Sequence, residues 1–130
     1  MYSFEEALEA SKKYFSNDEL AASVFINKYA LVDDDGNFLE KDPDQMHKRI
    51  AHEFARIEKK YKNPMQEEEI YSLLKDFKYI VPQGSPMSGI GNKEKIQSLS
   101  NCFVVESPYD SYGGILKTDQ EQVQIMKRRG

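Results

Sequence analysis

The sequence predicts an α+β, mostly helical chain, with a helical domain over residues 1–80 and a loop, a short strand and a last helix over residues 81–130. Three observations predict this class. Apolar residues recur at helical spacing in successive segments before residue 80. Proline and glycine then gather in residues 82–91, where the helical pattern stops. An apolar run over residues 98–105 follows and is typical of a buried strand.

The first helix is predicted over about residues 3–15, because a capping box opens it. In this pattern a serine at the N-cap (Ser3) is followed three residues later by a glutamate (Glu6). A second helix follows and can be capped by Asn17 or Asp18. Its buried side is expected to hold Leu20, Val24 and Tyr29.

Residues 31–39 are expected to form a hairpin, because two apolar pairs flank an Asp-Gly-Asn turn. The acidic cluster in this turn raises the question of calcium. An EF-hand loop needs glycine at its sixth position and glutamate at its twelfth. Counted from Asp33, these positions hold Phe38 and Asp44. The segment is therefore interpreted as a solvated acidic turn.

A third helix is predicted over residues 42–61, because Asp42 can cap it and Pro43 suits its first position. Its apolar stripe consists of Met46, Ile50, Phe54, Ile57 and Tyr61. A fourth helix begins at the acidic run 67–69, which suits the positive end of a helix dipole. Its expected buried face consists of Ile70, Leu73, Leu74 and Phe77.

The second half of the chain changes character. The prolines and glycines of residues 82–91 are expected to rule out regular structure. Pro108 ends the strand predicted over residues 98–105, and Asp110 or Ser111 can cap a last helix. A strand followed by a helix indicates the opening of an α/β unit that needs further strands to close.

Composition narrows the possible functions. A net charge of −4 disfavours general binding to nucleic acid. A single cysteine forms no internal disulfide and fits a reducing compartment. No apolar run approaches the roughly 20 residues of a membrane span. The N-terminus has no signal-peptide pattern, so we expect a cytoplasmic protein with no membrane partner.

The one cysteine, Cys102, is the first candidate for chemistry. A lone cysteine in an apolar strand is usually a small buried hydrophobe. A redox role needs a second thiol, which would have to come from another polypeptide or subunit. On the residues alone, both interpretations stay open.

The loop over residues 84–89 is the second candidate. Its hydroxyls and exposed backbone amides among glycines can cradle a phosphate, although a plain connecting loop has the same composition. The Gly-Lys-Ser/Thr ending of a P-loop is absent.

Histidines and the basic C-terminal run carry weaker signals. His47 and His52 lie five residues apart on one helix, which does not place them on one face for a metal. Residues 127–129, Lys-Arg-Arg, can attract phosphates, but a solvated cationic helix end is the favoured interpretation.

Four segments stand in a recognisable order and spacing: VPQGSPMS (81–88), LSNCFV (99–104), DSYGGI (110–115) and QIMKRRG (124–130). Together they closely resemble the catalytic subunit of ribonucleotide reductase. The residues of these segments are most similar to those of the adenosylcobalamin-dependent class II branch, with the diiron-dependent class I enzymes as the alternative. Residues 27–31 and 35–37 resemble the segment that precedes the barrel in that family.

The resemblance implies a fold and roles for individual residues. Residues 1–80 would be the N-terminal helical domain, and residues 81–130 would be the substrate loop and the first strand and helix of a ten-stranded α/β barrel. Cys102 resembles the barrel cysteine that, with a second cysteine later in the protein, reduces the substrate and ends as a disulfide. The residues expected around the substrate are Ser85, Ser100 and Asn101. Asp110 and Ser111 resemble positions of the specificity-effector site near a dimer interface.

The resemblance also implies partners and a cofactor. The activity would be that of a ribonucleoside-diphosphate reductase, which makes deoxyribonucleotides for DNA synthesis by radical chemistry. The cofactor would be adenosylcobalamin, or a diiron radical subunit in the alternative, with no metal or cofactor on this chain. Partners would be a C-terminal reductase fragment, a ribonucleotide substrate, a nucleotide effector and a thioredoxin-like reductant, in a dimer.

The sequence ends before the radical-bearing and partner cysteines of that family. We therefore expect the chain alone to be inactive and to assemble with a C-terminal fragment. Two alternatives remain: a non-catalytic protein that binds or regulates a reductase subunit, and an unrelated helical domain with a chance match in the loop.

Overall fold

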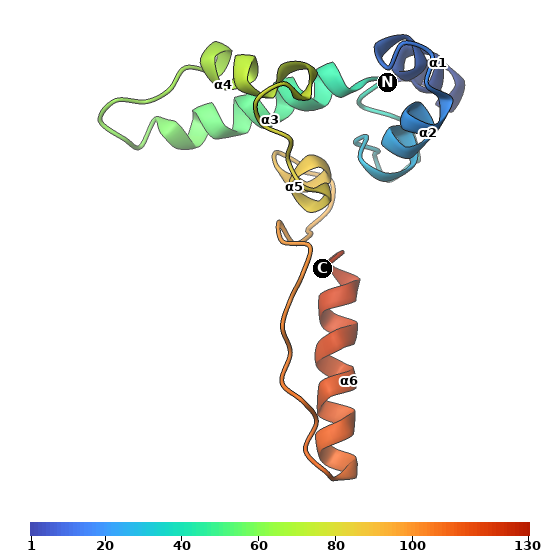
Figure 1. Cartoon of the computed structure of the whole chain (residues 1–130), viewed down its shortest axis with the longest axis vertical. Coiled ribbons are helices and arrows are strands. Elements are labelled where there is room, and N and C mark those ends of the chain that lie inside the picture. The colour runs from blue at the N-terminus through green and yellow to red at the C-terminus, as the bar shows by residue number, and fades with distance from the viewer.

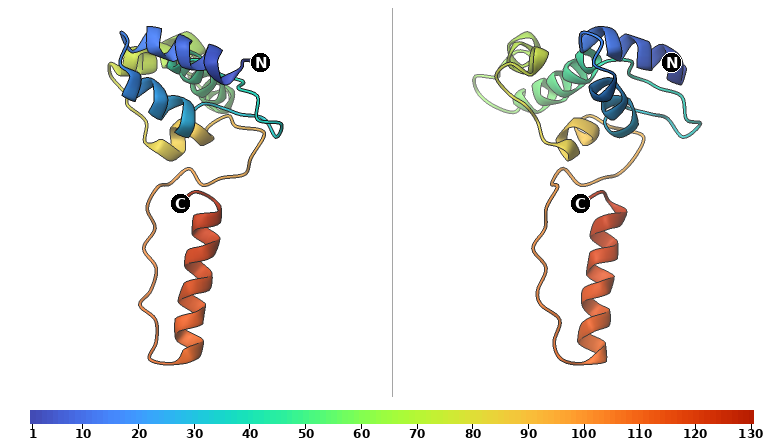
Figure 2. Two further views of the ribbon diagram at one scale, coloured as in Figure 1. Left: turned by 90° about the vertical axis from the view of Figure 1, so that its right-hand side faces the viewer. Right: turned by 45° about the vertical axis from the view of Figure 1, so that its right-hand side comes forward.

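The computed structural model describes residues 1–130 and consists of helices joined by turns and extended segments, with no strand. The helices are α1 (Phe4–Tyr14), α2 (Glu19–Lys28), α3 (Pro43–Glu58), α4 (Glu67–Leu74), the 3-10 helix η1 (Lys75–Phe77), α5 (Gly84–Gly89) and α6 (Tyr112–Lys127). Residues 1–92, named the body here, hold all helices but α6 (Figure 1). Residues 93–130, named the arm, project away from the body (Figures 1 and 2).

The caps predicted for the first two helices are confirmed. The Ser3 hydroxyl accepts a hydrogen bond from the Glu6 amide at 3.2 Å, and the Glu6 carboxylate accepts one from the Ser3 amide at 2.8 Å. Asp18 caps α2 by accepting from the Ala21 amide at 3.0 Å. The predicted buried side of α2 is wrong at Leu20, which is 76% exposed. The residues of α2 that are buried are Ala22, Phe25 and Ile26.

Helices α3 and α4 pack against each other and supply five of the eight core residues. Asp42 caps α3 by accepting from the Gln45 amide at 3.0 Å, as predicted. The helix ends at Glu58, so Tyr61, predicted to lie on its buried stripe, is 63% exposed. The core cluster consists of Ala7, Phe25, Ile26, Met46, Ile50, Ala51, Ile70 and Leu74.

The hairpin predicted over residues 31–39 is a tight turn held by isolated bridges. Val32 pairs with Phe38, and Phe38 also pairs with Tyr2. The Asp33 carboxylate accepts hydrogen bonds from the Asp35 and Asn37 amides, which closes the turn. The bonding of this carboxylate to its own turn, first to Asn37, lowers its pKa below the ordinary value.

The absence of regular structure predicted for residues 82–91 is wrong, because residues 84–89 form the short helix α5. Pro86 fits there because it is the third residue of the helix. The first amides of a helix have no intrahelical partner, so a missing N–H costs nothing at that position. Gly91 follows with a φ of +74°, a left-handed conformation that turns the chain away from the helix.

The buried strand predicted over residues 98–105 is not confirmed. The segment is extended, but it has no neighbouring strand to satisfy its backbone, and both Cys102 and Val104 are exposed. The last helix is confirmed as α6, which Ser111 caps by accepting from the Gly114 amide at 3.0 Å. None of its residues is buried.

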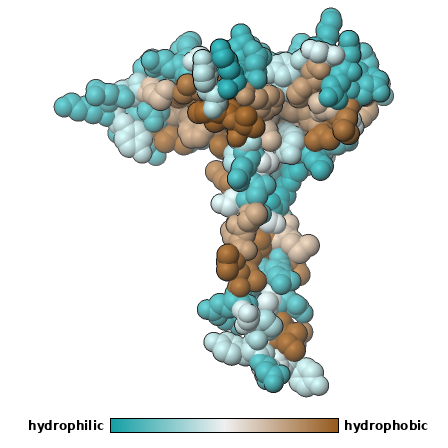
Figure 3. Space-filling model, viewed as in Figure 1, coloured by the Kyte–Doolittle hydropathy of each residue, from teal (hydrophilic) through white to brown (hydrophobic).

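Hydrophobic surface gathers at two places in the molecule. Figure 3 shows it on the body beside α3 and α4 and again along the arm. On the body it borders a cavity of about 350 Å³ whose lining includes Phe54, Met65 and Ile80. None of the helices combines the length and the apolar character that crossing a membrane requires.

Candidate functional site

The first site residue predicted from sequence, Ser85, lies on α5 and is buried. Its hydroxyl donates to the backbone carbonyl of Arg129 at 3.3 Å, which ties α5 to the chain beyond α6. Ser88, one turn later, is also buried and donates to the Gly84 carbonyl at 3.1 Å. Both hydroxyls of α5 are therefore held in place by the backbone.

Residues 97–101 cross α5 and contact it through two amide side chains. The Ser85 amide donates to Asn101 Oδ1 at 3.2 Å. Gln97 Nε2 donates to Ser88 Oγ at 2.8 Å. The structure thus brings together Ser85 and Asn101, two of the predicted substrate residues that are 16 positions apart in the chain.

The close crossing requires a residue without a Cβ atom at position 84, which glycine provides. A Cβ atom at Gly84 would lie 3.2 Å from Tyr29 Cε1 and 3.3 Å from Asn101 Nδ2. Those distances are tighter than most contacts between real side chains, so glycine lets α5 approach both neighbours. The first residue of α5 therefore fits between α2 and the segment that leads to Cys102.

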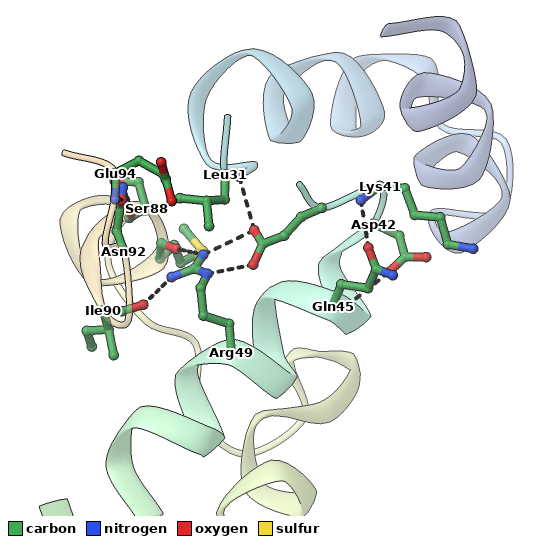
Figure 4. Close-up of polar contacts among 11 residues, drawn as sticks. Leu31, Lys41, Asp42, Gln45, Arg49, Ser88, Ile90, Asn92 and Glu94 are labelled. Carbon is green, nitrogen blue, oxygen red and sulfur yellow. Dashed lines mark hydrogen bonds and ion pairs between the residues drawn. The ribbon is translucent and has the colours of Figure 1, made fainter. Parts of the chain in front are cut away.

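The buried side chain of Arg49 on α3 holds the other end of α5. Its Nε and Nη2 atoms donate to the Glu40 carboxylate at 2.5 and 3.2 Å. Nη2 also donates to the Met87 carbonyl at 2.7 Å, and Nη1 donates to the Ile90 carbonyl (Figure 4). The two side chains are only 10% and 6% exposed. Arg49 therefore fixes the C-terminal carbonyls of α5 to the centre of the body.

The Glu40 carboxylate extends this network to the turn region. Its Oε2 atom accepts from the Leu31 amide at 3.1 Å (Figure 4). Sequence reasoning missed both Arg49 and Glu40. The pair joins residues nine apart through a turn and then contacts α5 some forty positions later. No local pattern marks such a pair.

The remaining predicted substrate residues lie on the exposed segment of the arm. Cys102 is a free, exposed thiol. The Ser100 amide donates to Ser98 Oγ at 3.0 Å, and Ser100 itself is exposed. Cys102 follows directly after Asn101, which contacts Ser85. The thiol thus belongs to the residue directly after one that contacts α5, and it is open to solvent.

The predicted effector residues lie at the opposite end of the arm. Asp110 and Ser111 precede α6, and Ser111 is its N-cap. A helix of 16 residues is about 24 Å long, and Arg129 at its other end meets Ser85. The structure therefore does not bring Asp110 and Ser111 together with Ser85, Asn101 and Cys102.

The histidines are placed as the sequence suggested, on different faces of α3. His47 is fully buried, packs edge-on against Phe77 with ring centroids 4.5 Å apart, and has no hydrogen-bond partner at either nitrogen. Burial lowers its pKa below the ordinary value. His52 lies on the surface, with Nδ1 2.9 Å from a carboxylate oxygen of Glu67.

A comparison with known families places this helical body. Residues 15–92 match the model of the ribonucleotide reductase all-alpha domain. The match covers more than half of the chain and runs from the end of α1 through α5. The chain therefore belongs to the ribonucleotide reductase family. It contains the all-alpha domain of a ribonucleotide reductase, a family that serves deoxyribonucleotide synthesis.

No curated protein matches the chain, and no solved structure does.

Proposed function

We propose that this chain supplies one redox-active cysteine and part of the substrate pocket of a ribonucleoside-diphosphate reductase. The cysteine is Cys102, and the pocket residues are Ser85, Ser100 and Asn101. The observation that supports the proposal is the hydrogen bond from the Ser85 amide to Asn101, which joins the loop to the segment holding Cys102. The matched all-alpha domain includes this loop.

The chemistry proposed for Cys102 needs a second thiol from outside these residues. Reduction replaces the 2′-hydroxyl of the ribose by hydrogen, and the hydroxyl leaves as water. Two thiols supply the two electrons and become one disulfide, which thiol–disulfide exchange with a thioredoxin-like protein then reduces. An exposed cysteine with no internal partner is compatible with both steps.

The residues of this chain do not fit the radical cofactor itself. A histidine that ligates a cobalamin must face a large open cavity, but His47 is enclosed in the core and His52 pairs with Glu67. No group of three or more metal-ligating side chains is present for a diiron site. Adenosylcobalamin, or the alternative diiron radical subunit, would be bound by other parts of the enzyme.

The arm offers a surface for assembly with the rest of a reductase. Val104 is fully exposed, and apolar side chains of α6 lie open to solvent: Ile115, Leu116, Val123 and Met126. Residues 81–130 are proposed to open the catalytic barrel, and further strands and helices of that barrel would cover these side chains. The chain would be inactive without that C-terminal part, and Asp110 and Ser111 would lie near a dimer contact that binds a nucleotide effector.

The test is to reconstitute activity around the chain. A tagged chain is mixed with extract of its source, recovered, and assayed for conversion of labelled ribonucleotide to deoxyribonucleotide with and without adenosylcobalamin. We expect activity that Cys102→Ser abolishes and that Glu106→Gln, at an exposed position of the same segment, leaves in place. Cobalamin-dependent activity assigns class II, and activity without cobalamin assigns class I.

The alternative function, a non-catalytic protein that binds a reductase subunit, gives a different result. In that case the recovered complex reduces ribonucleotides equally well with Cys102→Ser. That outcome would overturn the redox role of Cys102 while keeping the association of the chain with a reductase.

A further inference from the structure

A cavity of about 290 Å³ lies beside the α5 loop and contains none of the proposed substrate residues. Its apolar wall comes from the end of α2 and the segment after it. Its polar lining comes from three parts of the chain: Asn27 and Lys28 at the end of α2, Ser88 to Gln97 around α5, and Arg129 after α6. The polar lining residues are Asn27, Lys28, Ser88, Asn92, Lys95, Gln97 and Arg129.

The charge of this cavity is unusual for the chain. The net charge of the whole chain is −4, yet no aspartate or glutamate lines the cavity, which contains Lys28, Lys95 and Arg129. None of these three cations forms an ion pair with a carboxylate. The nearby Arg49, by contrast, is neutralised by Glu40. Folding thus gathers from distant parts of the sequence three exposed cations that form no ion pair.

Two of the cationic segments are held in position by hydrogen bonds. The Arg129 guanidinium donates to the Lys28 carbonyl at 3.1 Å and lies 3.5 Å from Gln97 Oε1. Asn92 Oδ1 accepts from the amides of Glu94 and Lys95 at 2.9 and 3.1 Å, which fixes the turn that carries Lys95. Arg129 retains further N–H groups for a ligand, because an arginine has five donors.

The structure assigns this cavity as a binding site for a phosphate group. Like charges brought together repel, and a multivalent anion removes that repulsion while accepting hydrogen bonds from Arg129 and the lysines. The cavity volume is near the lower end of ligand sites and suits a phosphate or pyrophosphate with part of an attached group. Identifying that group as a nucleotide rests on the function proposed above, but the anion site does not.

The site is tested on the whole chain by titration calorimetry at low ionic strength, with pyrophosphate as the first probe. Cytidine diphosphate and cytidine follow as the second and third. We expect pyrophosphate to bind and cytidine, which has no phosphate, not to bind. Tighter binding of the diphosphate than of pyrophosphate identifies a nucleotide as the source of the phosphate. Equal or weaker binding identifies free phosphates as the source.

Substitutions locate the binding. Lys28→Gln and Lys95→Gln are each expected to weaken pyrophosphate binding about fivefold, and the double variant roughly twentyfold. Lys62→Gln is the matched control, because Lys62 is an exposed lysine outside the cavity. Far-UV circular dichroism verifies that each variant is folded.

Three results would overturn the assignment: no binding of pyrophosphate by the folded chain, unchanged binding in the double variant, or an equal loss in Lys62→Gln. Failure of the anion site leaves the Cys102 activity test untouched, since no cavity residue is used in that test. Conversely, Cys102→Ser is expected to bind pyrophosphate as the unchanged chain does, so the two proposals fail separately.

Discussion

The body buries part of its apolar side chains in a core, whereas the arm buries none of its own. Every buried residue of the chain lies at or before Ser88, in the body. The arm contains apolar residues at a comparable density, yet those of α6 remain exposed or only partly covered. The body therefore buries a core of its own and still leaves apolar surface beside α3 and α4, whereas no apolar side chain of the arm is buried within these residues.

Because of this difference, the proposed site consists of one buried part, around Ser85, and one exposed part, around Cys102. Ser85 is buried, and its hydroxyl donates to the Arg129 carbonyl. At the other end of α5, Arg49 donates to the Met87 carbonyl. Cys102 lies on the exposed segment of the arm. The loop is thus held by contacts from both the body and the arm, whereas the thiol lies open to solvent.

The largest effect is expected from breaking the buried ion pair of the body. Arg49→Met leaves the Glu40 carboxylate buried without its partner and frees the carbonyls of Met87 and Ile90. Removing one member of a buried pair costs about 3–5 kcal/mol of stability. Urea denaturation followed by circular dichroism measures this as a lower midpoint.

Arg56→Met is the matched control for that experiment. Arg56 pairs with Glu53 on the same helix, but its side chain is 58% exposed. An exposed pair contributes about 0–1 kcal/mol, so the midpoint should move little. Equal losses in the two variants would contradict the central position given to Arg49.

A pair of matched truncations compares the two regions directly. Ile50 is fully buried in the core, and Ile50→Ala should cost about 2–5 kcal/mol of unfolding free energy. Leu116 on α6 is 66% exposed, and Leu116→Ala should change it by less than about 0.5 kcal/mol. The measurement is again urea denaturation. A large loss at Leu116 would show that the arm packs against the body in solution.

The helices of the body could be predicted from sequence because their signals are local. Ser3, Asp18 and Asp42 each cap a helix through a residue three positions later, so a short window contains both partners. The stripe of α3 identified Met46 and Ile50 as buried by periodicity alone. Where a stripe ran past the helix, as at Tyr61, the prediction was wrong.

The parts that sequence could not predict depend on distant partners. Helix α5 was missed because proline and glycine counted against it, while its stability comes from Arg49 and from the crossing of residues 97–101. The ion pair of Arg49 with Glu40 has no local signature for the same reason. The strand over residues 98–105 was inferred from composition, and composition does not supply the neighbour that a strand needs.

Lowering the pH is expected to have an intermediate effect on the free energy of unfolding, through His47 in the body. Burial lowers the pKa of His47 in the folded chain below its ordinary value of 6.5. The unfolded chain therefore takes up the proton first as the pH falls below about 6.5, so the free energy of unfolding decreases there. His47→Leu should remove this part of the pH dependence, measured by urea denaturation at a series of pH values.

Two features separate this effect from other titrations. His52→Gln should keep the pH dependence, since His52 lies on the surface. Asp44 and Asp76 are the acids that favour a charged His47, and burial outweighs them. The pKa of Asp44 is itself lowered, because its bonds to Lys48 and Tyr71 outweigh its burial, so its contribution is lost only below its ordinary value of 3.8. An unchanged profile in His47→Leu would contradict the assignment.

The smallest effect is expected at Cys102, because folding should hardly change the rate at which its thiol is modified. Its thiol is exposed, so a thiol reagent should modify it in the folded chain within about twofold of its rate in urea, after correction for the effect of urea on the reagent.

Ser11→Cys in a Cys102→Ser background provides the contrast. Ser11 is fully buried in the body, and its thiol should react more than about a hundredfold more slowly, because modification there requires opening of the core. If Cys102 proved equally protected, the arm would be folded onto the body. If it became protected only when a reductase partner is added, that partner would be the surface that the apolar residues of the arm lack.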